Sequence, residues 1–251
     1  MTIQHPESEA SVGAMFDRIA PRYDFLNRLL SARQDQRWRR VLVDFVPYRP
    51  EGRYLDVATG TGDVLLAARE AHSEYEVFVG ADISQAMLEI ARTKALTQSK
   101  ERALPNPKWA HAAPLPPVDF RRVSAESLCF GDQSFDCLSI SFGLRNVVRR
   151  PQAIKEFHRV LKVDGTLLIL EFFIPRRGLI SALFQLYFHT ILPFIGGLVS
   201  DRAAYKYLPQ SVGSFYAPDE LRTVLYDGGF KVDEVVSFLF GACRLFKATR
   251  C

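Results

Sequence analysis

Cysteine is scarce in this chain, and the spacing of the few that occur excludes two kinds of scaffold. Among 251 residues there are four cysteines, at positions Cys129, Cys137, Cys243 and Cys251. They form no C-x-x-C pair and have no histidine at zinc-ligand spacing, so neither a disulfide framework nor a structural zinc site is expected. We therefore predict reduced thiols, a cytoplasmic location and no bound metal.

The chain also has little excess of charge of either sign. Lys and Arg total 32 against 28 Asp and Glu, which leaves a formal net charge of +4. No basic tract accompanies this surplus, and the nearest approach is the group Arg33, Arg37, Arg39 and Arg40. Nucleic acid is therefore not expected as a partner. Residues 1–15 have no apolar core and do not resemble a signal peptide.

Hydrophobic residues are plentiful, at 48% of the chain, and they are arranged as alternating strands and helices. From Arg53 the pattern reads as strand, glycine turn and helix, and it then repeats. Strands are expected in RYLDV, EVFVGAD, 120–124, FDCLSISFG, GTLLILEFF and a closing hairpin at 230–250, and helices over 64–71, 86–97, 151–161 and PDELRTVLYDGGF. This order predicts an α/β, Rossmann-like fold with a seven-stranded sheet whose last strand is antiparallel.

The segment before the first strand has apolar residues at helical spacing, interrupted by Pro21. We predict two or three short helices there, with Tyr23 and Asp24 in the loop between the first two. The expected organisation is an N-terminal helical cap over residues 1–50, followed by a Rossmann-like domain over 51–251.

Two further segments depart from the alternation. Residues 99–118 hold five prolines and no periodicity, so they are expected to form a surface excursion without helix. Residues 178–200 contain no Asp, Glu, Lys or Arg. A membrane span is disfavoured there, because the elements that follow should complete the same sheet. We expect an apolar, helical insertion over about 178–210, and peripheral contact with a membrane stays open.

A glycine loop follows the first strand, in the sequence Asp56-Val57-Ala58-Thr59-Gly60-Thr61-Gly62-Asp63. Glycines at such a turn let a nucleotide-like ligand approach the backbone. The next strand ends about twenty residues later at Asp82, where a carboxylate can accept hydrogen bonds from ribose hydroxyls. A dinucleotide fingerprint requires glycine where Leu65 stands, so the loop favours S-adenosylmethionine over a nicotinamide cofactor. The segment Ser124-Ala125-Glu126 is expected to meet the adenine edge.

Several segments together resemble one family. They are FDRIAPRYDFLNRLLS, RYLDVATGTGD, ADISQAML, FDCLSISFGLRNV, FHTILPFIGGLVS and YKYLPQSV. In order and spacing they are similar to the ubiquinone/menaquinone-biosynthesis C-methyltransferases, whose menaquinone branch contains the demethylmenaquinone methyltransferases. The resemblance implies a class I fold dependent on S-adenosylmethionine, with methyl transfer to a ring carbon of a polyprenylated quinol, such as demethylmenaquinol to menaquinol. It implies cofactor contacts at Thr61, Asp82, Ser124, Ala125 and Ser141, beside the loop glycines Gly60 and Gly62. The family usually has Asn where Ser124 stands.

The chemistry implied by this resemblance requires an ionised hydroxyl beside the attacking ring carbon, so the acceptor is expected to be the reduced quinol. Arg145 follows the fourth strand, where it can favour the quinolate anion. Asn146 can orient a water or the quinol oxygen, and Tyr23 with Asp24 belongs to the cap that excludes water. His189 is a further titratable candidate in the uncharged run, although a packed histidine is the more ordinary interpretation.

Other functions stay open at this point. A methyltransferase acting on another small aromatic substrate and a nicotinamide-dependent dehydrogenase share the expected fold. Amino-group methyltransferases often carry a Pro-Pro-aromatic motif after the fourth strand, where this chain has Ser141-Phe142-Gly143-Leu144. A non-catalytic binding module is disfavoured by the intact glycine loop and Asp82. Self-association into a homo-oligomer also stays open.

Overall fold

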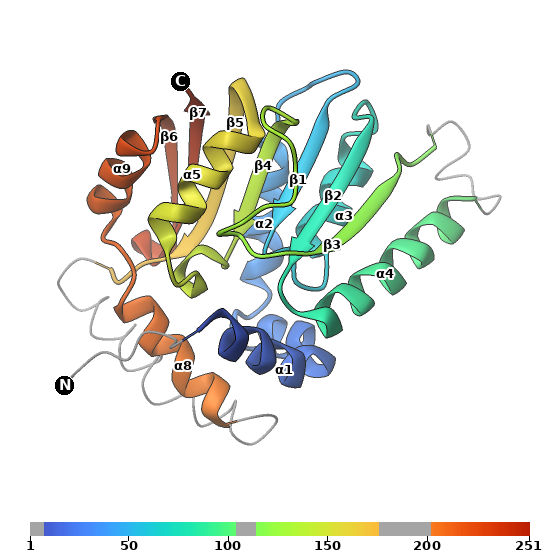
Figure 1. The fold of residues 1–251 in the computed structure, drawn as a ribbon. Helices are drawn as coiled ribbons and strands as arrows, with labels where there is room; N and C mark the ends of the chain where they lie inside the picture. The colour runs from blue at the N-terminus through green and yellow to red at the C-terminus, as the bar shows by residue number, and fades with distance from the viewer. Residues whose placement is uncertain (1–7, 104–113, 176–201) are drawn as a thin grey trace.

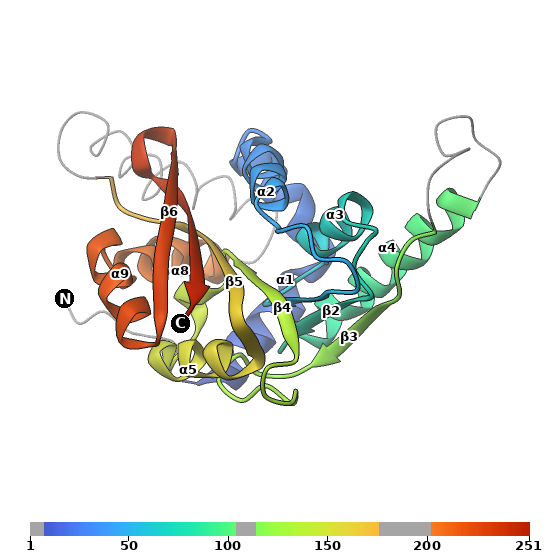
Figure 2. The ribbon, with the colours of Figure 1, turned by 90° about the horizontal axis from the view of Figure 1, so that it is seen from above.

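The strands of the described residues form one mixed sheet on which the rest of the fold is built. The structure is a computed structural model and describes residues 8–103, 114–175 and 202–251. Within them seven strands lie in the order β3-β2-β1-β4-β5-β7-β6 (Figures 1 and 2). The strands are β1 Arg53–Val57, β2 Val77–Asp82, β3 Val118–Arg122, β4 Phe135–Ser141, β5 Leu161–Phe172, β6 Phe230–Phe238 and β7 Cys243–Arg250. Among these seven strands β7 alone runs opposite to the other six, which confirms the predicted fold and closing strand.

Helices cover both faces of this sheet (Figure 2). They are α1 Glu9–Leu30, α2 Gln34–Asp44, α3 Asp63–Ala71, α4 Gln85–Ala103, α5 Arg150–Val160, α8 Arg202–Gly213 and α9 Pro218–Asp227, with 3₁₀ turns η2 Leu144–Asn146 and η4 Leu239–Gly241. Side chains alternate between the faces along each strand. Leu55 of β1 packs with Phe157 of α5 and Leu221 of α9. Its neighbour Tyr54 packs on the other face with Leu65 of α3.

The first helix corrects the prediction of short N-terminal helices. α1 is a single helix of 22 residues with Pro21 inside it, so Tyr23 and Asp24 lie within the helix and not in a loop. Proline removes one backbone hydrogen bond from a helix interior, and packing offsets this loss. Leu26 of α1 and Met87 of α4 are fully buried against each other's helices in a small apolar cluster. Tertiary packing therefore keeps the helix continuous at Pro21, where the local sequence predicts a break.

Two further boundaries differ from the sequence-based expectation. α4 continues to Ala103, so residues 99–103 are helical, and the prolines of the expected excursion begin only at Pro105. β3 covers Val118–Arg122 in place of 120–124. The apolar run 178–200, with His189, lies outside the described residues, as does 104–113. Among the residues that are described, no helix has the length and hydrophobicity needed to cross a bilayer.

α1 lies across the carboxyl edge of the sheet, where the parallel strands end (Figure 1). The Ser84 hydroxyl and the Ala86 N–H, both just after β2, donate to Oδ1 of Asp17 in α1 at 2.6 and 3.1 Å. The Thr61 hydroxyl, after β1, donates to Oδ1 of Asp24 at 2.6 Å. Two carboxylates of one helix thus attach it to the loops that follow two neighbouring strands.

A polar chain crosses the centre of the sheet between β1 and β4. The Tyr54 hydroxyl donates to Ser139 Oγ at 2.6 Å, and the Ser139 hydroxyl donates to Oδ1 of Asp56. Oδ2 of Asp56 accepts the Thr59 hydroxyl at 2.6 Å, which ties the glycine loop to the strand. Burial raises the pKa of Asp56 from 3.8 to about 6, although the hydrogen bonds from Ser139 and Thr59 oppose this shift.

The raised pKa of Asp56 predicts a pH-dependent stability. Between pH 3.8 and about 6 the folded chain keeps a proton on Asp56 that the unfolded chain has lost. The free energy of unfolding should therefore fall as pH rises through this window, by about 2–3 kcal/mol from this group. Denaturant unfolding across the window should show this contribution in the wild type and not in Asp56→Asn. An equal slope in both proteins would contradict the assignment.

Candidate functional site

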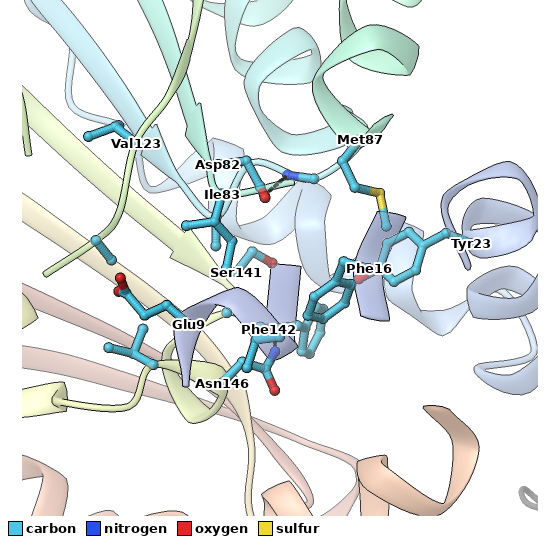
Figure 3. Close-up of a pocket in the computed structure, with 16 residues that line it drawn as sticks. Glu9, Phe16, Tyr23, Asp82, Ile83, Met87, Val123, Ser141, Phe142 and Asn146 are labelled. Carbon is cyan, nitrogen blue, oxygen red and sulfur yellow. Dashed lines mark hydrogen bonds between the residues drawn. The ribbon is translucent and has the colours of Figure 1, made fainter. Parts of the chain in front are cut away.

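A cavity opens at the carboxyl edge of the sheet, between α1 and the ends of the strands (Figure 3). Apolar side chains form most of its lining, and a few polar groups lie among them, which is typical of sites for small molecules. Its walls are formed by Glu9, Val12, Phe16, Tyr23, Ala58, Gly60, Asp82, Ile83, Met87, Val123, Ala125, Ser141, Phe142, Gly143, Asn146 and Val147. Six of the residues singled out from the sequence thus meet in one place: Tyr23, Gly60, Asp82, Ala125, Ser141 and Asn146.

The glycine loop brings bare backbone to this cavity. Gly60 has φ +56°, and no atom lies within 4 Å of the position that a Cβ would occupy there. A ligand can therefore approach the main chain at Gly60 directly. Gly62 has φ +83°, and a Cβ on it would lie 3.1 Å from the Cβ of Ala91 in α4. Gly62 thus serves both the turn and the close packing of α4, in a conformation that other residues rarely adopt.

Asp82 closes β2 and binds the loop to the next helix. Its Oδ2 accepts the N–H of Gly60 at 2.8 Å, and its Oδ1 accepts the N–H of Ser84 at 2.8 Å. Burial raises the pKa of Asp82, while the hydrogen bonds from Ser84 and Gly60 oppose the rise. The carboxylate lies at the cavity wall with its orientation fixed by these two backbone donors (Figure 3).

Two buried polar atoms at the cavity wall have no hydrogen-bond partner within the described part of the chain. They are Oγ of Ser141, at the end of β4, and Oδ1 of Asn146, in the turn η2. The Asn146 side chain is held by its other end, because Nδ2 donates to the Phe142 carbonyl at 3.3 Å. A buried polar atom without a partner is costly, so these two positions are the ones that a bound ligand would satisfy.

A second, polar pocket adjoins the first beneath Tyr23. Tyr23, Ala58, Gly60 and Ser141 line both, so the two form an apolar part and a polar part of one site. The polar pocket adds Arg39, Asp56, Thr59, Thr61, Asp63 and Val64.

Charges of both signs surround this polar pocket. Lys94 Nζ lies 2.5 Å from Oδ2 of Asp24 and 2.6 Å from Oδ1 of Asp63, and it donates to the Thr61 hydroxyl at 3.0 Å. Arg39 also pairs with Asp63. Although burial raises the pKa of Asp63, the charges of Arg39 and Lys94 lower it further, so that carboxylate is ionised at neutral pH. A zwitterionic group would find partners for both of its charges here.

Arg145 does not line either pocket, which differs from the place expected for it beside a substrate. Its side chain is buried, and Nη1 donates to Oε1 of Glu171 and to the Phe142 carbonyl, both at 2.6 Å. The Arg145 N–H also donates to Oε2 of Glu171, at 3.2 Å. The positive charge is thus balanced by a carboxylate on β5, and the pair fixes the turn that carries Asn146.

Ser124 also has a different surrounding from the one expected. Its hydroxyl donates to the carboxylate of Glu9, at the start of α1, and it lies in a groove beside the main cavity. Its neighbour Ala125 does line the cavity. The contact of Ser124 with an adenine ring stays a prediction.

The sequence reasoning missed four residues that shape this site. Glu171 carried a signal, since it is the one acid in the apolar strand segment GTLLILEFF. Nothing in the sequence pattern indicated a role in the site for Lys94, Glu9 or Asp17, because each lies on a helix, where a charged residue ordinarily faces solvent. Their roles depend on contacts between segments that are distant in the sequence.

Comparison with known proteins agrees with the fold and identifies the family. A chain named ubiquinone/menaquinone biosynthesis C-methyltransferase from Geotalea uraniireducens is 44% identical over 225 residues, 90% of each chain. A demethylmenaquinone methyltransferase from Thermus thermophilus is 43% identical over 219 residues, 87% of this chain and 92% of that one.

Solved structures resemble the chain in fold at much lower identity. The cyclase SpnF has a TM-score of 0.66 at 18% identity, covering 99% of this chain and 98% of its own. A possible histamine N-methyltransferase from Thermotoga maritima, described as dependent on S-adenosylmethionine, has a TM-score of 0.62 at 18% identity, covering 95% and 99%. Since a cyclase and a methyltransferase share this fold, the fold alone does not fix the activity.

The family is therefore assigned from sequence similarity and not from the fold. A family model matches nearly the whole chain, over residues 4–250. The match confirms the family inferred from the motifs. With its glycine loop, Asp82 and seven-stranded sheet, this chain belongs to the ubiE/COQ5 methyltransferase family and has the fold of S-adenosylmethionine-dependent methyltransferases.

Proposed function

We propose that this protein transfers the methyl group of S-adenosylmethionine to a ring carbon of a reduced polyprenylated quinone, with demethylmenaquinol as acceptor and menaquinol as product. The observation that carries the proposal is the family match over residues 4–250, and the pair of unpartnered polar atoms at the cavity wall, Ser141 Oγ and Asn146 Oδ1, supports a ligand at this place. The names of the relatives supply the class of acceptor. A benzoquinol ring is the alternative acceptor within the same family.

The described residues fit S-adenosylmethionine in its two chemical parts. The adenosine would occupy the apolar part of the site, between Met87 and Ala125, with the ribose hydroxyls donating to Asp82. The methionyl group would occupy the polar pocket, near Thr61 and Lys94, where both charges of an amino acid find partners. Ser141 lines both pockets and so lies at their junction. When bound, the cofactor supplies an electrophilic methyl group there.

The acceptor ring must be activated before a carbon atom can attack. A phenolic hydroxyl has a pKa of about 10, and its anion makes the neighbouring ring carbon nucleophilic. Asn146 is the residue we assign to the quinol oxygen. Its Nδ2 is held by the Phe142 carbonyl, and its free Oδ1 can accept a hydrogen bond from the quinol hydroxyl or from a bridging water, so that it orients the hydroxyl while the proton leaves to water. Tyr23 of α1, which lines the same cavity, is the second proposed contact.

Arg145 acts in this proposal as a positioning residue. Its charge is paired with Glu171 inside the protein, so it contributes little field to the cavity. It donates to the same Phe142 carbonyl that Asn146 contacts, and both residues belong to the turn η2. The ion pair thereby fixes the direction of the Asn146 amide.

Residues 1–50 are proposed to act as a cap over the reacting groups. α1 contributes Glu9, Phe16 and Tyr23 to the cavity wall, and its contacts through Asp17 and Asp24 hold it there. A lid of this kind excludes water, which would otherwise compete for the methyl group and solvate the quinolate.

The cofactor site predicts a specific loss in Asp82→Ala. Two hydrogen bonds to a carboxylate are each worth roughly 1.5–3 kcal/mol, so affinity for adenosylhomocysteine should fall at least tenfold in calorimetry. Asp82→Asn tests the charge while keeping the shape, since Asp82 also holds Gly60 and Ser84. The matched control is Glu76→Ala. Glu76 is an exposed acid directly before the first residue of β2, and this variant should bind adenosylhomocysteine normally. Unchanged affinity in both Asp82 variants would refute the assignment.

For the acceptor, the test residue is Asn146. Removing a group that positions the reacting hydroxyl can lower kcat by about a hundredfold. Asn146→Ala should show this loss with the affinity for adenosylhomocysteine nearly intact, and Gln152→Ala, an exposed amide on α5, should have normal turnover. If Asn146→Ala turned over normally, or lost cofactor affinity instead, Asn146 would not contact the acceptor.

The reaction itself is tested with purified protein, methyl-labelled S-adenosylmethionine and short-chain quinones of both ring types. Label should enter a ring carbon of the dithionite-reduced naphthoquinol and not of the oxidised quinone, because only the quinol supplies a phenolate. Transfer to the reduced benzoquinol alone would establish the alternative acceptor. Transfer to neither ring, or to an oxygen atom, would overturn the proposal.

A further inference from the structure

Large apolar side chains are exposed at two corners of the carboxyl edge. In the last turns of α1, Phe25 is 59% and Leu29 is 48% exposed, and their spacing of four residues places them side by side on the helix. At the tip of the hairpin between β6 and β7, Leu239 is 49% and Phe240 is 81% exposed. Paired exposure of this kind marks interaction surfaces more often than single apolar residues do.

The two corners belong to one surface because α2 connects them. α2 begins directly after the turn that ends α1. The ring of Trp38 in α2 lies 6.2 Å from the ring of Phe238, the residue before Leu239. It also lies 6.2 Å from the ring of Phe142, which lines the cavity. The exposed apolar residues and the mouth of the site therefore lie on the same edge of the molecule.

The outer side of α2 and the residue before it carry an arginine stripe, formed by Arg33, Arg37 and Arg40. Their spacing of four and three residues places them on one side of the helix. All three are exposed, and within the described residues none forms an ion pair or a side-chain hydrogen bond. Two acids lie within α2: Asp35 is buried and accepts the Ser31 hydroxyl, and Asp44, at the end of the helix, is exposed and forms no ion pair within the described residues. The three arginines of the stripe therefore outnumber the one exposed acid of this helix.

The first residue of the arginine stripe and the tip of the hairpin have backbone conformations that residues other than glycine rarely adopt. Arg33 has φ +63°, and Leu239 and Phe240 have φ +44° and +54°. Non-glycine residues in this left-handed region are strained, and such residues gather at functional sites.

We propose that Phe25, Leu29, Leu239, Phe240 and the arginine stripe dock the protein on the surface of an anionic lipid bilayer. The apolar side chains enter the headgroup region, and the guanidinium groups bind lipid phosphates. The inference rests on the proposed function in one respect: docking would turn the site toward the membrane that holds a polyprenylated acceptor. The lipid surface itself is recognised by chemistry that needs no acceptor.

The test is sedimentation of the full chain with vesicles that contain no quinone. Phosphatidylcholine vesicles with phosphatidylglycerol should bind the protein, vesicles of phosphatidylcholine alone should bind it much less, and salt should weaken the binding. Each arginine contributes about fivefold to partition onto an anionic surface, so R33Q/R37Q/R40Q should lose about a hundredfold. L239S/F240S should also lose binding. Both variants should match the wild type in thermal unfolding and in turnover of a short-chain quinol in solution.

A charge-matched control separates docking from general attraction. R49Q/K155Q/K231Q removes three exposed positive charges that lie away from this edge, and it should bind nearly as the wild type does. The proposal is overturned if the wild type does not bind anionic vesicles, or if the control loses as much as the stripe variant. It is also overturned if L239S/F240S instead abolishes a wild-type dimer in sedimentation, because the surface would then join two copies. None of these outcomes depends on methyl transfer, which is assayed separately in solution.

Discussion

The carboxylate of Asp82 is the contact on which the arrangement of the site depends. It accepts one backbone donor from the glycine loop after β1 and one from the start of α4, each at 2.8 Å. Ser84, which is fixed in this way, donates in turn to Asp17 of α1. One buried acid therefore sets the relative positions of a loop, a helix and the helix above them. Because the group is also at the cavity wall, the same contact that builds the site presents the carboxylate to a ligand.

The division of the site into an apolar and a polar part suits one ligand that has two chemically unlike parts. Charges gather around Thr61, where Lys94 and Arg39 keep Asp63 ionised despite its burial. The other part is lined by aliphatic and aromatic side chains, among them Ile83 and Met87. Buried charges need partners nearby, whereas apolar rings need none. In the proposed function, the methyl group of S-adenosylmethionine lies at the junction of these two parts, which Ser141 lines from both sides.

The sequence predicts the parts of this structure that depend on local pattern. Strands β1, β4 and β5 follow from their apolar runs, and α9 follows from Pro218 and from Glu220, whose carboxylate accepts the Ala217 N–H at 2.7 Å. The site residues Gly60 and Asp82 follow from their spacing within a strand-turn-helix unit.

Features that depend on contacts between distant segments could not be read in this way. Pro21 looks like a break, yet packing against α4 keeps α1 continuous. Arg145 looks like a substrate contact, yet Glu171, far along the chain, takes its charge. In both cases a contact with a residue distant in the sequence determines the structure. The residues next to Pro21 or Arg145 in the sequence give no information about that contact.

The most direct measurement is a crystal structure of the protein with adenosylhomocysteine. We expect ribose hydroxyls within hydrogen-bond distance of Asp82, the amino-acid part beside Thr61 and Lys94, and the sulfur atom near Ser141 and Asn146. A ligand bound elsewhere, or one whose ribose makes no contact with Asp82, would contradict the assigned cofactor site.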